Sequence, residues 1–140
     1  MSREETQATI DAYLEHLLSD GSYEDFFAED IVVSMMDVGR EVKGRDSTRE
    51  AVEYLHEVAF DAASELVTII YEEGIASAEV IFIAIQIGKF AGVQPTGAEV
   101  RVPYSVVWEL KNGQITALRL YQLASGLTEQ VSAFSEAVAH

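Results

Sequence analysis

The sequence predicts an α+β domain in which a strongly curved antiparallel sheet wraps around N-terminal helices. Segments with helical periodicity open and close the chain, and segments with β periodicity fill most of its second half. The clearest signal is Asn112-Gly113 between two apolar runs, because both residues tolerate the positive φ of a two-residue hairpin turn. Apolar side chains alternate along the first of these runs and share one face: Val100, Val102, Tyr104, Val106, Trp108 and Leu110.

The chain begins with a predicted helix over residues 4–19. Its apolar positions recur at three- and four-residue spacing, and Asp20-Gly21 provides the stop. A short helical turn is expected over 23–28, followed by the first strand over 31–36. The predicted apolar stripe of the helix is Ile10, Tyr13, Leu14, Leu17 and Leu18.

A second long helix is predicted after a polar turn at 39–44. Ser47 and Glu50 have the spacing of a capping box, in which each residue satisfies a free backbone N–H at the helix start. The helix is expected to reach about Ala62. Its predicted stripe is Ala51, Val52, Leu55, Val58, Ala59 and Ala62.

Residues 65–72 and 75–89 predict a second hairpin, joined at Glu73-Gly74. The stretch 80–87 is apolar on both faces of its strand, which in an antiparallel sheet implies cover on both sides. The chain's own helices cover one side, so we expect a homodimer formed through the outer face of the sheet. A final helix is predicted over 127–138, with Ser125 as its cap.

Composition narrows the possible partners. The 140 residues are expected to form one domain, 1–140, with 24 acidic and nine basic residues and a net charge of −15. This charge repels phosphate backbones and anionic lipid, so neither nucleic acid nor membrane is an expected partner. The absence of cysteine excludes thiolate chemistry. Without a secretory signal or an apolar stretch of membrane-spanning length, we expect a cytoplasmic location.

Three stretches together resemble a known family. They are FFAEDIVV at 26–33 followed by V-x-G-R-D at 42–46, then G-x-F-x-G-x-x-P-T-G at 88–97, and finally the NGQI turn with R-x-Y and G-L-x-x-Q at 112–130. The chain is similar to the SnoaL-like polyketide cyclase and ester cyclase family, which has the nuclear transport factor 2-like fold. The resemblance implies a cone-shaped α+β barrel with an apolar pocket and a small hydrophobic, polyketide-like ligand.

The carboxylates that handle protons in related enzymes are not carried over by this sequence. The aspartate position that the resemblance assigns to cyclases falls on Leu123, and the first aspartate position of the ketosteroid isomerases falls on Met35. Their second aspartate falls on Ser105 or Val106, and only the tyrosine survives, as Tyr13. We therefore expect a lumen poor in carboxylates.

Three residues remain as candidate catalytic groups. Tyr13 lies on the inward stripe and would donate to an oxyanion, or equally would only find a structural partner. His56 has a near-neutral pKa suited to a general base, and its alternative role is a half-exposed core residue. Asp37 would lie at the pocket mouth if the first strand continues, or else begins the turn.

The remaining predicted site residues would contact the substrate. Arg119 would hold a carboxylate or enolate, although a salt bridge to an acidic neighbour is the commoner use. No element carries metal-ligand spacing, so neither a metal nor another cofactor is expected. The predicted function is a cyclase or isomerase, with a non-catalytic small-molecule binding protein and a structural module as alternatives. The predicted lining residues are Met35, Tyr104, Val106, Trp108, Arg119, Tyr121 and Leu123.

Overall fold

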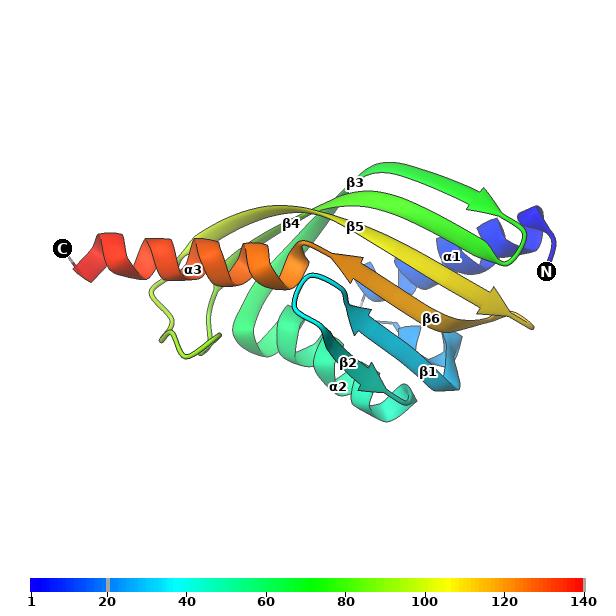
Figure 1. The fold of residues 1–140 in the computed structure, drawn as a ribbon, viewed down its shortest axis with the longest axis horizontal. Helices are drawn as coiled ribbons and strands as arrows, with labels where there is room; N and C mark the ends of the chain where they lie inside the picture. Colours follow the sequence, from blue (N-terminus) through cyan, green and yellow to red (C-terminus); the bar gives the residue numbers. More distant parts are fainter. Residues whose placement is uncertain (20, 140) are drawn as a thin grey trace.

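A computed structural model, which describes residues 1–19 and 21–139, contains a strongly curved six-stranded sheet with helices packed against it (Figure 1). The strand order is β2-β1-β6-β5-β4-β3, so β2 and β3 are the two edges of an unclosed sheet. The predicted α+β class is confirmed.

The helices are α1 (Arg3–Leu18), α2 (Arg45–Glu53) and α3 (Leu123–Ala139), with a 3₁₀ turn η1 (Tyr23–Phe26) and a π-helix η2 (Tyr54–Ala59). The strands are β1 (Phe27–Met35), β2 (Arg40–Lys43), β3 (Phe60–Glu72), β4 (Ile75–Gln86), β5 (Glu99–Lys111) and β6 (Gln114–Tyr121).

Some predictions concern residues outside this description. Asp20, half of the predicted helix stop, and His140 lie outside the described residues. The same holds for the side chains of Leu18 and Val138, which the predicted helices include.

Helix α1 begins with a capping box. The Ser2 hydroxyl accepts a hydrogen bond from the Glu5 amide at 3.1 Å, and the Glu5 carboxylate accepts from the Ser2 amide at 3.2 Å. These bonds satisfy two of the free N–H groups that every helix start exposes. The helix therefore begins close to its predicted position, and its stripe residues Ile10 and Tyr13 are buried.

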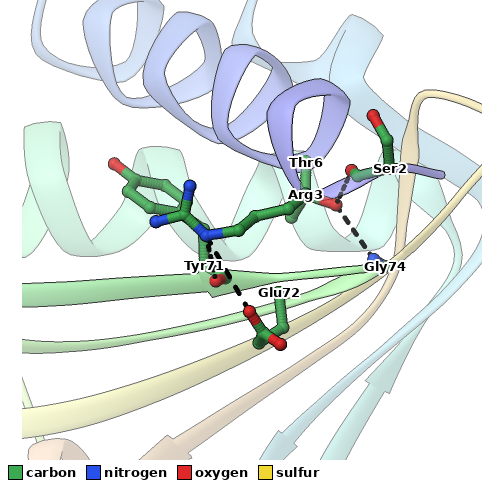
Figure 2. A network of polar contacts seen from close by, with 6 residues as sticks. All are labelled: Ser2, Arg3, Thr6, Tyr71, Glu72 and Gly74. Atoms are coloured by element: carbon green, nitrogen blue, oxygen red, sulfur yellow. Dashed lines mark hydrogen bonds and ion pairs between the residues drawn. The ribbon is translucent and has the colours of Figure 1, made fainter.

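The first turn of α1 is fastened to the β3–β4 hairpin (Figure 2). Thr6 is fully buried, donates to the Ser2 carbonyl and accepts from the Gly74 amide at 2.9 Å. Arg3 donates to the Tyr71 carbonyl at 3.2 Å. These partners are about 70 positions apart in the sequence. The hydrogen bonds between them fix the angle at which α1 lies over the sheet.

The sheet is mixed, which corrects the prediction that it is antiparallel throughout. Strand β1 pairs with β6 in parallel, while the other neighbouring strands are antiparallel. The predicted polar turn at 39–44 contains the short strand β2, which folds back on β1. Val42 explains why this segment pairs, since its side chain packs against the core.

The segment predicted as one helix over 47–62 is instead α2, the π-helix η2 and the start of β3. A π-turn holds more residues than an α-turn, so it rotates the following side chains away from the α-helical stripe. Val58, a predicted stripe residue, is therefore 57% exposed, while Ala59 is buried. Opposite η2, a Cβ on Gly88 would lie 2.2 Å from the Val58 carbonyl oxygen, so this crossing requires glycine.

Helix α3 starts at Leu123, four residues before its predicted start, and Ser125 lies inside it rather than capping it. The Asp37 carboxylate accepts from the Ser125 amide at 2.9 Å and from its hydroxyl at 2.6 Å. Farther along α3, the Gln130 amide donates to the Arg101 carbonyl at 2.7 Å and accepts from its N–H at 2.8 Å. Contacts between distant segments therefore place this helix.

The concave face holds two apolar clusters, one at each end. The first lies under α1 and includes Ile10, Tyr13 and Trp108, and the second lies under α3 and includes Leu127 and Val131. Tyr104 and Leu120 pack against both clusters. The space between α1, η2 and the sheet lies near the junction of the two clusters.

Candidate active site

A cavity of about 90 Å³ lies where α1, η1, α2 and η2 face the inner side of β3. Helix α1 contributes Leu17 and η1 contributes Tyr23. The strand contributes two small side chains, Ala62 and Ser64, and these leave the space open. The remaining lining residues come from α2 and η2: Val52, Glu53, His56 and Glu57.

His56 is the group in this cavity best suited to accept a proton. Its Nδ1 lies 3.0 Å from the Val52 carbonyl oxygen, and since that oxygen only accepts, Nδ1 carries the hydrogen. Burial lowers the pKa of His56 below its usual value, more than the Val52 hydrogen bond raises it. The ring packs edge-on against Phe82, with centroids 5.7 Å apart. The imidazole is therefore neutral at pH 7, and Nε2 has a free lone pair.

Three tyrosines near the cavity keep their protons. Burial, together with Glu53 and nearby carboxylates, raises the pKa of Tyr23 to about 12. Burial also raises the pKa of Tyr104 to about 12, while the neighbouring Ser64 hydroxyl acts in the opposite direction. Tyr13 is more deeply buried, and this burial raises its pKa strongly. Each hydroxyl is therefore a hydrogen-bond donor at neutral pH.

Tyr13 is buried, at 4% exposure, in an aromatic group at the α1 end of the concave face. Its ring lies 5.7 Å from Phe27 and 6.5 Å from Trp108, measured between centroids. Trp108 is also buried, and its Nε1 has no hydrogen-bond acceptor among the residues that the structure describes. Neither Tyr13 nor Trp108 lines the cavity.

Two carboxylates stand at this cavity. Glu53 forms an ion pair with Arg49 at 3.2 Å, and Glu57 is exposed on the next part of η2. The expectation of a carboxylate-poor lumen is therefore wrong for the cavity. The acids come from α2 and η2, the helical segment between β2 and β3.

Arg119 and Tyr121 lie on the outer face of the sheet, not in the lumen, and this corrects their predicted position. A β-bulge between Glu109 and Leu110 shifts the register, so that Val106 and Trp108 pair with Leu120 and Leu118. Without the bulge, Arg119 would face inward beside Val106, because a one-residue shift moves each side chain to the other face. Arg119 forms an ion pair with Glu109, the commoner use that the sequence also allowed.

The other predicted site residues divide between the core and the surface. Val106 is buried in the cluster under α1, and Leu123 is the first residue of α3, buried in the second cluster. Met35 is half-buried at the end of β1. Asp37 is exposed in the β1–β2 turn, where it binds the start of α3. None of these four residues lines the cavity.

Sequence reasoning missed Tyr23, Ser64, Glu53 and Glu57 as cavity residues. Glu53 and Glu57 precede and follow His56 closely, so an α-helical stripe through His56 would have included Glu53. Ser64 was placed outside the strands because the predicted helix extended to Ala62. The π-helix, which the sequence did not indicate, ends that helix earlier and allows Ser64 to face the cavity.

A second hollow, of about 310 Å³, is open on the surface at the start of α2. Its lining combines Glu29 and Asp46 with Arg45, whose Nε donates to the Phe27 carbonyl at 2.9 Å. It contains no histidine or tyrosine. We therefore place the candidate site in the smaller, more enclosed cavity.

Across residues 1–19 and 21–139, no three His, Asp or Glu side chains gather in a way that would hold a metal ion. No helix in the described part of the chain is both long and apolar enough to cross a membrane.

A curved sheet with helices over its concave face and a small cavity between them define an α+β cone protein. The family model described as a SnoaL-like domain matches residues 7–118 of the 140, so the chain belongs to the SnoaL-like domain family. No curated protein matches the chain.

Solved structures with this fold carry different functional descriptions. A proposed SnoaL-like polyketide cyclase from Jannaschia sp. CCS1 has a TM-score of 0.81 at 18% identity, with 94% of each chain covered. AclR, a proposed hydroxylase from Streptomyces galilaeus, has a TM-score of 0.78 at 23% identity, covering 94% of this chain and 98% of that one. An LEH-like epoxide hydrolase from M. tuberculosis has a TM-score of 0.71 at 15% identity, covering 93% and 86%. These similarities establish the fold, and the chemistry depends on the site.

Proposed function

We propose that this protein is a cyclase- or isomerase-type enzyme that moves a proton on a small apolar, polyketide-like molecule. The observation that carries the proposal is His56: it lines the cavity, its Nδ1 is held by the Val52 carbonyl, and burial keeps it neutral. A fixed, neutral imidazole with a free Nε2 is a competent general base at pH 7. In this proposal, His56 takes the role of base that the family resemblance would assign to an aspartate.

The cavity also supplies donors for the negative charge that proton removal creates. The Tyr23 and Ser64 hydroxyls line it, and Tyr104 lies beside Ser64. Donors fixed before the reaction stabilise an oxyanion more than water does, because they need no reorganisation. In this proposal, Nε2 of His56 removes a proton next to a carbonyl, and a hydroxyl donates to the resulting enolate oxygen. The proton then returns to a different carbon.

The size of the cavity limits the substrate. A cavity of roughly 150 Å³ is known to accept benzene, and this one measures about 90 Å³. A ligand of several fused rings would therefore require the cavity to widen, through movement of Leu17 or Tyr23. A branched or single-ring molecule needs the least widening and is the better probe.

A non-catalytic binding protein is the second candidate function. The same cavity would serve it, and the apolar residues Met35 and Leu123, at the positions where the resemblance would assign acids, favour it. The two candidates differ in whether His56 is needed for turnover or only contacts the ligand.

The deciding experiment uses cyclohex-3-enone, which isomerises to the conjugated enone when a base moves one proton. Turnover is followed by ultraviolet absorbance, and binding by the fluorescence of Trp108, the only tryptophan in the chain. His56→Gln should lower kcat by roughly 10²–10⁴-fold and leave binding within a few-fold. His16→Gln is the matched control, because His16 makes the same type of bond, to the Ala12 carbonyl at 2.7 Å, outside the cavity.

The pH profile tests the same assignment. Since burial lowers the pKa of His56, kcat should be constant above pH 6.5 and decrease only below it. Wild-type turnover that His56→Gln leaves intact would contradict the enzyme proposal as stated. Binding without turnover would support the binding protein instead.

A further inference from the structure

We propose that the cavity selects its ligand by charge: Glu57, together with Glu53, favours an apolar molecule that carries an ammonium group and disfavours carboxylates. This inference rests on the proposed function, because it assumes that the cavity holds the ligand. It adds the chemical class of that ligand. Neutral molecules of the same shape should bind with intermediate affinity.

The first support is the position of the two carboxylates. Both residues line the cavity, Glu53 from α2 and Glu57 from η2, on either side of His56 in the sequence. Arg49 neutralises Glu53 through the ion pair at 3.2 Å. For Glu57, residues 1–19 and 21–139 provide no ion-pair partner. The net charge at this cavity is therefore negative.

The second support is that the carboxylate field reaches the interior of the cavity. Burial has the largest effect on the pKa of Tyr23. The next largest effects come from the negative charges of Glu53, Glu24 and Glu57, and all three raise the pKa. The hydroxyl of Tyr23 therefore experiences a negative potential, which Arg49 only partly offsets. A ligand anion in the same space would experience the same repulsion.

The third support is the absence of a cation among the lining residues. His56 is neutral, and the remaining polar groups are the Tyr23 and Ser64 hydroxyls. A carboxylate that enters loses its hydration and gains no opposite charge, which is unfavourable. An ammonium group at the mouth keeps part of its hydration and gains Glu57, while its apolar body contacts Leu17, Val52 and Ala62.

The experiment compares isobutylamine, isobutanol and isobutyrate, which share a branched body and differ in the head group. Each is titrated into the full-length protein at pH 7.5 and low salt, and binding is followed by NMR on the His56 ring and the Trp108 indole signal. Isobutylamine should bind about fivefold more tightly than isobutanol, the size expected for one partly screened charge pair, and isobutyrate should bind most weakly.

Two substitutions should shift this preference in opposite directions. Glu57→Gln should remove most of the advantage of the amine and leave isobutanol unchanged. Arg49→Gln, which frees Glu53, should increase the advantage. Glu79→Gln is the control, since Glu79 is exposed on the outer face of β4 and loses the same charge from the whole protein.

The outcomes separate the two proposals. The charge selection would be overturned if isobutyrate bound as tightly as isobutylamine. It would also be overturned if Glu57→Gln and Glu79→Gln had equal effects. Either result leaves the proposed function intact. If none of the three molecules perturbs His56, the cavity is not a ligand site, and the proposed function fails together with this inference.

Discussion

The two ends of the concave face are held in different ways. At the α1 end, a capping box and a regular apolar stripe within about fifteen residues specify the helix, and bonds from its first turn to the β3–β4 hairpin only set its angle. At the α3 end, the helix is held by Asp37 and by Arg101, which lie 88 and 29 positions from their partners. The cavity lies between these ends. Its shape therefore depends on the contacts that local sequence patterns do not describe.

The largest effect is expected at Gly88, on the α3 side of the cavity. A Cβ there would lie 2.2 Å from the Val58 carbonyl oxygen, and all the nearest atoms are backbone of Val58 and Ala59, which cannot rotate away as a side chain can. Gly88→Ala should lower the free energy of unfolding by about 3 kcal/mol, at the upper end of overpacking effects. Urea denaturation measures this. Gly92→Ala is the control: Gly92 has a positive φ but open space, so about 1 kcal/mol is expected. Equal losses for the two variants would contradict the close crossing.

A substitution at Thr6 tests how the α1 end is held, again through the free energy of unfolding. Thr6→Val keeps the shape but leaves the Gly74 amide without its acceptor, which should lower the free energy of unfolding by about 1–3 kcal/mol. Thr9→Val is the matched control, because the Thr9 hydroxyl donates to the Glu5 carbonyl one turn earlier, within α1 itself. If Thr9→Val destabilises as much as Thr6→Val, the bond to the hairpin does not anchor α1.

Asp37 distinguishes a structural role from the catalytic role that the sequence allowed. Asp37→Ala should lower the free energy of unfolding by about 1 kcal/mol, as for a lost helix cap. Hydrogen bonds from Ser125 hold the pKa of Asp37 below its usual value despite partial burial. The contribution is therefore present at neutral pH and is lost as pH falls through that lowered pKa. Turnover of cyclohex-3-enone should not change. A large loss of kcat would contradict the structural role and support a catalytic role for Asp37.

The smallest effect on stability is expected on the outer face of the sheet. We expect a homodimer there, because Ile85 and Ile70 are exposed on it and none of the described helices covers it. Ile85→Glu should leave the fold unchanged and convert a particle of twice 15.4 kDa into a monomer. Light scattering at micromolar concentration measures the mass. A wild-type protein that is already monomeric would disprove the dimer.

The sequence predicted the elements that local rules specify. The β5–β6 hairpin has positive φ at Asn112 and Gly113, as the Asn-Gly turn requires, and the inward face of β5 is the predicted one. Helix α1 and the buried Tyr13 follow from spacing alone. These succeed because the periodicity of an isolated helix or strand already determines which face is apolar.

Tertiary structure decided the rest, in each case through a local irregularity or a distant partner. The bulge after Glu109 turned Arg119 outward, and η2 ended the second helix early and brought Ser64 and Glu57 to the cavity. Parallel pairing of β1 with β6 joined segments about 85 residues apart. A bulge or a π-turn adds one residue to a repeat, and this is stable only when neighbouring elements pack against the shifted face. The sequence by itself therefore determined which residues are apolar and the approximate places of α1 and the two long hairpins. Only the packed structure decided which polar side chains meet at the cavity.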